Sequence, residues 1–135
     1  MLTLPCGDVT QTSVVFNLYV LLGFVQAWIQ HHRGTFVLQG CIEDSATAEI
    51  ARSQLWQWIH FQVPIIGEDG ICDVRCTPMV VARLLKDTAV EFVGLDPSLP
   101  FLCWQILTTP QFVPFLTTYL LNHLPQNELC LNSHL

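Results

Sequence analysis

Charge is scarce in this sequence. Charged residues make up 12% of the 135 residues, and 5 of them are Lys or Arg. An ordinary soluble domain has about a quarter of its residues charged. With so few basic residues and a net charge of −6, the chain has no clustered basic face with which to bind nucleic acid. Its low charge indicates that part of its surface meets a partner or a membrane.

The sequence also lacks the length for a large architecture. A (β/α)₈ barrel takes roughly 200 residues at the least, so no complete barrel fits into 135 residues. The length suits one domain of common size. There is no internal repeat and no low-complexity tract.

A dense disulfide framework is absent as well, because the six cysteines are irregularly spaced: Cys6, Cys41, Cys72, Cys76, Cys103 and Cys130. Cys72 and Cys76 form one close pair, but no second Cys/His pair lies at a distance that would complete a four-ligand zinc site. Residues 1–12 carry Asp8 as their sole charge and so lack the positive region of a secretory signal. We therefore expect reduced thiols in an intracellular compartment and no metal bound by this chain.

The most apolar stretch, Val14 to Ile29, is interrupted by Asn17 and Gln26. A membrane-spanning helix takes about 20 mainly apolar residues, so a buried core helix is the favoured interpretation and a membrane span is the alternative. We expect Ser13 to cap this helix and the helix to run to about Gln30.

A second helix is predicted over residues 46–60. One stripe at helical spacing is apolar, and it comprises Ala48, Ala51, Leu55, Trp58 and Ile59. Ile50 and Trp56 fall outside that stripe, so we expect this helix to meet a second surface. Before it, Thr35 to Leu38 is predicted as a brief extended segment.

Two Thr-Pro pairs predict helix starts, because Thr caps a helix and Pro fits its first position. Thr77-Pro78 leads into a helical stripe of Val81, Leu84, Leu85 and Thr88. Thr109-Pro110 predicts a helix to about Leu124. Leu99-Pro100 predicts a break before a short helix over residues 101–107.

Turn residues predict a small hairpin within residues 61–76, around Asp69-Gly70. Apart from that hairpin the chain is predicted to be all-α, mainly a helical bundle. Residues 1–12 form an unplaced irregular segment, 13–125 the helical domain and 126–135 a polar tail.

The segment from Glu43 to Ile59 reads Glu-Asp-Ser-Ala-Thr-Ala-Glu-Ile-Ala-Arg-Ser-Gln-Leu-Trp-Gln-Trp-Ile. It resembles the malate synthase motif Met-Glu-Asp-Ala-Ala-Thr-Ala-Glu-Ile-Ser-Arg, which continues into Gln-x-Trp-Gln-Trp-Ile. Ile42 replaces the usual Met and Ser45 the usual Ala. Looser similarity extends from Asn17 to Tyr119. The resemblance implies the C-terminal helical cap domain of malate synthase, without the TIM barrel that it closes.

The resemblance also implies a chemistry. Malate synthase condenses acetyl-CoA with glyoxylate and releases malate and CoA. The acetyl methyl group is a weak acid, so the reaction needs a positioned base and a stabilised enolate. In the family the base is the Asp of the Glu-Asp pair, which is Asp44 here. The Mg²⁺ ligands and the Arg that polarises the aldehyde lie on the barrel, so we expect this chain alone to be inactive.

On residue type and position alone, Asp44 is more simply a helix N-cap. Both roles can hold, because a cap fixes the direction of the side chain and the helix dipole favours a carboxylate. Glu43 is a candidate to support Asp44, or else a solvated surface carboxylate. Arg52 is a candidate to hold a CoA phosphate, although a surface salt bridge with Glu49 is the favoured interpretation. Trp56 and Trp58 are expected to be packing residues, with Trp58 in the core stripe and Trp56 toward the barrel.

The sequence ends in Ser133-His134-Leu135, which is similar to the peroxisomal address Ser-Lys-Leu. Many eukaryotic malate synthases are peroxisomal or glyoxysomal. We therefore expect this localisation, reached through the peroxisomal import receptor, with the cytoplasm as the alternative. The signal also suggests that the missing part of the chain is N-terminal.

Other interpretations make different predictions. A truncated homologue acting as an interaction protein would bind its partner through an apolar patch around Ile50 and Trp56. A membrane-associated helical protein would be anchored by Val14 to Ile29. A partial gene product would have no function of its own.

Overall fold

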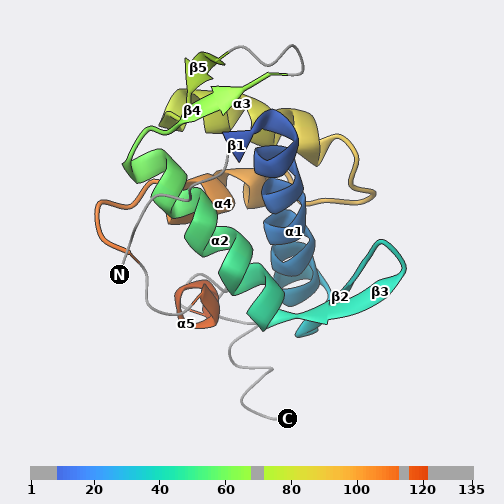
Figure 1. The fold of residues 1–135 in the computed structure, drawn as a ribbon. Coiled ribbons are helices and arrows are strands. Elements are labelled where there is room, and N and C mark those ends of the chain that lie inside the picture. The colour runs from blue at the N-terminus through green and yellow to red at the C-terminus, as the bar shows by residue number, and fades with distance from the viewer. Residues whose placement is uncertain (1–8, 68–71, 113–115, 122–135) are drawn as a thin grey trace.

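The computed structural model describes residues 9–67, 72–112 and 116–121. Within these residues the chain forms five helices and two small sheets (Figure 1), which confirms the mainly helical prediction. The helices are α1 (Gln11–Gln30), α2 (Ser45–His60), α3 (Pro78–Ala89), α4 (Ser98–Leu107) and α5 (Leu116–Leu121). α1 contacts α2, α3 and α4, so it is the central element of one apolar core.

α1 shows the burial expected of a core helix. Among the described residues it is the one helix long and apolar enough to cross a membrane. Half of its most apolar window is nevertheless buried inside this fold, which favours the core interpretation. Its cap is Thr10, whose hydroxyl oxygen accepts from the Ser13 N–H at 3.1 Å. The prediction of Ser13 as the cap was therefore wrong, and that of an end at Gln30 is confirmed.

A strand precedes α1 where an irregular segment was predicted. β1 (Val9–Thr10) pairs in parallel with β4 (Pro64–Ile66), which in turn pairs antiparallel with β5 (Cys72–Arg75). The predicted hairpin within residues 61–76 is confirmed by β4 and β5, while its Asp69-Gly70 turn lies outside the described residues. β1 escapes sequence reasoning because its partner lies more than 50 residues along the chain.

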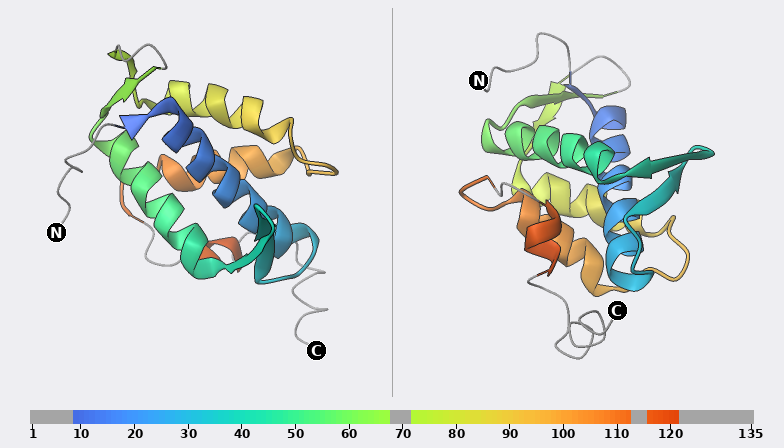
Figure 2. Two further views of the ribbon diagram at one scale, coloured as in Figure 1. Left: turned by 45° about the vertical axis from the view of Figure 1, so that its right-hand side comes forward. Right: turned by 90° about the horizontal axis from the view of Figure 1, so that it is seen from below.

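A second hairpin links α1 to α2. β2 (Thr35–Leu38) confirms the predicted extended segment, and it pairs antiparallel with β3 (Cys41–Asp44), which was not predicted. The connecting residues Gln39 and Gly40 both have positive φ, at 50° and 81°, as tight hairpin turns require. This hairpin projects beyond the helices and leads directly into α2 (Figure 2).

The two Thr-Pro pairs behave differently. At α3 the Thr77 hydroxyl accepts from the Val80 N–H and Pro78 occupies the first position, and the predicted stripe of this helix is buried. At Thr109 the hydroxyl instead donates to the carbonyls of Ile106 and Gln111. It caps no helix, and α5 starts at Leu116, so the predicted start at residue 109 was wrong.

α4 starts earlier than predicted, because Pro100 lies in its first turn, where a missing N–H costs nothing. Asp96 holds this helix start: the Ser98 N–H and the Ser98 hydroxyl both donate to Asp96 Oδ1. Among the described side chains, the thiols of Cys41, Cys76 and Cys103 are free.

Candidate functional site

Asp44 lies at the corner where β3 ends and α2 begins. It is the N-cap of α2, with Asp44 Oδ1 accepting from the Ala46 N–H at 2.9 Å. The predicted cap is therefore confirmed. The Asp44 side chain is exposed, so its carboxylate is held in direction and remains open to a reacting molecule.

The hairpin places Asp44 on an open, apolar face. Asp44 lies opposite Thr35, and Ile42 lies opposite Val37. Because side chains alternate between the two faces of a hairpin, these four residues share one face, which we call the outer face. Val37 is 68% exposed and Ile42 is 76% exposed, so the outer face presents two large apolar side chains beside the carboxylate.

The inner face of the hairpin is packed. Phe36 and Leu38 are buried against the core, and α1 makes room for the Phe36 ring at Gly23. A Cβ atom on Gly23 would lie 3.1 Å from Phe36 Cδ2. Glu43 lies opposite Phe36 and is partly buried. The hairpin is thus fixed on α1 by its inner face.

Glu43 is held rather than solvated. The Thr47 hydroxyl, in the first turn of α2, donates to Glu43 Oε2 at 2.8 Å. The Glu43 carboxylate therefore has a hydrogen-bond partner in the fold, and its role in supporting Asp44 stays a prediction. Sequence reasoning did not single out Thr47.

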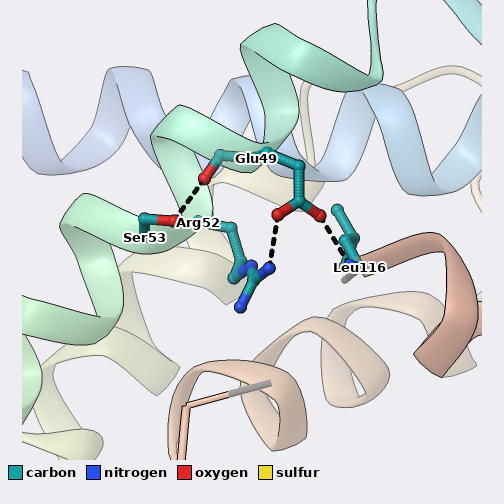
Figure 3. A network of polar contacts seen from close by, with 4 residues as sticks. All are labelled: Glu49, Arg52, Ser53 and Leu116. Atoms are coloured by element: carbon teal, nitrogen blue, oxygen red, sulfur yellow. Dashed lines mark hydrogen bonds and ion pairs between the residues drawn. The ribbon is translucent and has the colours of Figure 1, made fainter. Parts of the chain in front are cut away.

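Arg52 forms the predicted pair with Glu49, but not at the surface. The Arg52 guanidinium is fully buried, its Nη2 lies 2.5 Å from Glu49 Oε2, and it lies 4.2 Å over the Phe112 ring. The other oxygen of Glu49 accepts from the Leu116 N–H (Figure 3). The surface salt bridge was therefore the wrong interpretation: this pair joins α2 to α5 inside the fold.

Trp56 is also buried, contrary to the expectation that it faces a barrel. Its indole N–H donates to the Thr109 carbonyl at 3.0 Å, and its ring stacks on His60 and meets the edge of Phe112. Trp58 lies in the core as predicted. Ile50 is 63% exposed, so the apolar patch expected around Ile50 and Trp56 contains Ile50 without the indole.

A groove of about 520 Å³ borders the outer face. It lies between α1, the hairpin and the segment after α3, and Val37 and Ile42 contribute to its wall. His31 and Arg33 also line it. The outer face therefore continues into a cavity that carries an imidazole and a guanidinium, neither of which the sequence had singled out.

A family model described as "Malate synthase, C-terminal" matches residues 8–124. The chain belongs to the malate synthase family. The match confirms the resemblance and extends beyond the predicted range of Asn17 to Tyr119. Ile42, where malate synthases were expected to have Met, keeps the outer face apolar.

Curated malate synthases match most of this chain. It is 42% identical to "Malate synthase A" of Escherichia coli over 120 residues, which cover 84% of this chain and 22% of that protein. It is 32% identical to "Malate synthase" of Dictyostelium discoideum over 117 residues, covering 82% of this chain and 21% of that protein. It is 34% identical to "Malate synthase, glyoxysomal" of Zea mays over 83 residues, which cover 62% of this chain and 14% of that protein. The chain thus spans about a fifth or less of the length of these relatives.

The described residues provide no set of ligands for the Mg²⁺ that is expected in a complete malate synthase. Among the described residues, no group of three or more His, Cys, Asp or Glu side chains could hold a metal ion. Glu43 and Asp44 are sequence neighbours, but Oε2 of Glu43 accepts from Thr47 and Oδ1 of Asp44 accepts from Ala46. The residues of this site therefore do not fit a metal centre.

Proposed function

We propose that this chain supplies the catalytic-base domain of a malate synthase, and that Asp44 removes a proton from the acetyl methyl group of acetyl-CoA. The enolate carbon then attacks the aldehyde carbon of glyoxylate, the π electrons of that C=O bond move to its oxygen, and the alkoxide takes up a proton. Water then hydrolyses the thioester, which gives malate and CoA. The observation that carries the proposal is the position of Asp44: it is exposed at a helix N-terminus, on the outer face.

The local geometry suits a general base. A base works when its direction is fixed relative to the proton that it removes. The Ala46 N–H holds Asp44 Oδ1, and we assign the proton to the second oxygen, Oδ2.

The described residues supply the base and not the rest of the chemistry. They contain no metal-ligand cluster, and stabilising an enolate takes donors or cations aimed at its oxygen. We therefore propose that the chain alone makes no malate, and that the outer face meets the barrel of a malate synthase, which binds glyoxylate. Val37 and Ile42, both exposed, suit such a contact.

Arg33 replaces Arg52 as our candidate for a contact with a CoA phosphate. Arg52 is fully buried and paired with Glu49, whereas Arg33 is exposed and lines the groove that borders the outer face. A guanidinium there can form paired hydrogen bonds with a phosphate.

For localisation we propose the peroxisome or glyoxysome. Two observations support this: the C-terminal Ser133-His134-Leu135, which lies outside the described residues, and the similarity to the glyoxysomal malate synthase of Zea mays.

The proposal can be tested in a chimera. The 120 residues of the Escherichia coli relative that match this chain are replaced by the corresponding residues of this chain, and malate formation is measured with acetyl-CoA, glyoxylate and Mg²⁺. Asp44→Asn keeps the cap, because Asn also accepts at an N-cap, but removes the base. Asp87→Asn, at an exposed position on α3, is the matched control.

We expect an active chimera whose kcat falls at least a thousandfold in Asp44→Asn and stays unchanged in Asp87→Asn. A folded chimera in which Asp44→Asn keeps its activity would refute the base. A folded chimera without activity would favour the alternative of a non-catalytic interaction protein, whose contact surface is the exposed set Val37, Ile42 and Ile50.

A further inference from the structure

The position of the Asp44 carboxylate depends on the backbone corner between β3 and α2, because the Asp side chain is short. Two hydrogen bonds cross this corner. One joins Asp44 Oδ1 to the Ala46 N–H at 2.9 Å, and the other joins Glu43 Oε2 to the Thr47 hydroxyl at 2.8 Å. Both run from the end of the strand into the first turn of the helix.

The Thr47 hydroxyl does not bond to the backbone of its own helix, whereas three other helical hydroxyls in this fold do. Ser53, Thr88 and Thr108 each donate to the backbone carbonyl four residues earlier, within or at the end of their own helix. Thr47 donates to a carboxylate outside its helix. Its bond therefore contributes to the angle between strand and helix rather than to the helix alone.

Glu43 is also linked to α1, through the backbone pairing of its strand. It lies opposite Phe36, and Phe36 is buried beside Gly23 of α1. The Thr47 bond thus ties α2 to a strand pair that packs on α1. Glu43, which lies between Phe36 and Thr47 in this arrangement, is the immediate neighbour of Asp44 in the sequence.

From these contacts we infer that Thr47 is a positioning residue: through Glu43 it holds the corner that aims the Asp44 carboxylate. This inference rests on the proposed role of Asp44 as the base. Without the Thr47 hydroxyl, Glu43 is released and the corner loosens. Misplacing a reacting group by about 1 Å costs on the order of a hundredfold in rate, while substrate binding elsewhere is unaffected.

The test uses Thr47→Val, which keeps the shape and removes the hydroxyl, and Thr47→Ser, which restores the hydroxyl. Ser53→Ala is the matched control, because it removes another hydroxyl of α2 whose acceptor is the Glu49 carbonyl. In the chimera we expect Thr47→Val to lower kcat about ten- to a hundredfold, with KM for acetyl-CoA within about twofold. Thr47→Ser and Ser53→Ala should stay within about threefold in both constants.

Hydrogen exchange of the Ala46 amide in the 135-residue chain gives a second readout that needs no activity. We expect this exchange to accelerate in Thr47→Val and in Glu43→Gln, and not in Ser53→Ala. Full kcat in Thr47→Val, in a chimera that Asp44→Asn inactivates, would overturn the positioning role and leave the base intact. Activity that survives Asp44→Asn would overturn the base, and unchanged Ala46 exchange would then reject the Thr47 contact independently.

Discussion

Glu49 and Arg52 form an ion pair in which the guanidinium is fully buried and the carboxylate side chain is 29% exposed. Glu49 accepts from Arg52 with one oxygen and from the Leu116 N–H with the other. One carboxylate therefore joins α2 to α5 and balances the buried charge between them.

Glu49→Ala should destabilise the fold by about 2–4 kcal/mol. Removing one partner leaves a buried guanidinium without its counter-charge, which costs about 3–5 kcal/mol in fully buried pairs; the partial exposure of Glu49 reduces that cost. Urea unfolding of the 135-residue chain measures the change. Glu91→Ala is the control, since Glu91 is exposed and its loss should stay within about 0.5 kcal/mol. Equal stability of the two variants would contradict this role for the pair.

Gly23→Ala should not raise the free energy of unfolding, although replacing a glycine inside a helix usually raises it by up to about 1 kcal/mol. The new Cβ would lie 3.1 Å from Phe36 Cδ2, and the ring must give way. Gly23→Val should cost about 1–3 kcal/mol through overpacking. Thermal or urea unfolding measures both changes. Gly34→Ala, where an added Cβ meets nothing within 4 Å, should be close to neutral; a clear gain in stability at Gly23 would show that the hairpin does not rest tightly on α1.

The cysteines should differ in reactivity. Burial raises the pKa of Cys76 to about 12 and raises that of Cys103 further, so near neutral pH both remain thiols, the unreactive form. Cys41 is exposed. Brief treatment with iodoacetamide, followed by peptide mass spectrometry, should label Cys41 and spare Cys76 and Cys103, and unfolding in urea should remove the difference. Rapid labelling of Cys103 in the folded chain would contradict the packing around α4.

The start of α4 should contribute a pH-dependent part of stability. Hydrogen bonds from the Ser98 N–H and then the Ser98 hydroxyl lower the pKa of Asp96 below its ordinary 3.8. A lowered pKa means that the fold favours the carboxylate. Its contribution is therefore complete above about pH 5 and is lost as the pH falls through the folded value.

The measurement compares the wild-type chain with Asp96→Asn by urea unfolding between about pH 5 and pH 2. The stability difference between the two should shrink as the pH falls. Asp87→Asn serves as the control. If the stability difference between the wild-type chain and Asp87→Asn shrank in the same way, the effect would not arise at Asp96.

Much of the helical framework was predictable because its signals are local. The apolar stripe of α2 and the cap-and-proline start of α3 at Thr77-Pro78 depend on neighbours within one or two turns. Asp44 was identified by the motif from Glu43 to Ile59, and its role as a helix cap followed from residue type and position. The hairpin turn at Gln39-Gly40 was not predicted, although the sequence shows Gly40 at this position.

Some of the errors concern residues whose partners lie far along the chain, whereas others are local, such as the cap of α1 at Thr10 instead of Ser13. Arg52 looked like a surface cation, because the sequence around it does not show that Phe112 and Leu116 fold over α2. Thr109 looked like a helix cap, but its hydroxyl binds nearby carbonyls and its own carbonyl accepts from Trp56.

The sequence by itself determined the helical class, the family motif and the identity of the residue that we propose as the base, because periodicity, caps and motif residues act over short stretches of chain. The tertiary structure alone decided which charges are buried and how the Asp44 carboxylate is held. Arg52 is enclosed by α5 and the segment before it, and Asp44 is aimed by a hairpin that rests on α1 at Gly23. Both outcomes depend on contacts between segments distant in sequence, and the burial of a charge is set by everything that packs around it rather than by its neighbours in the chain.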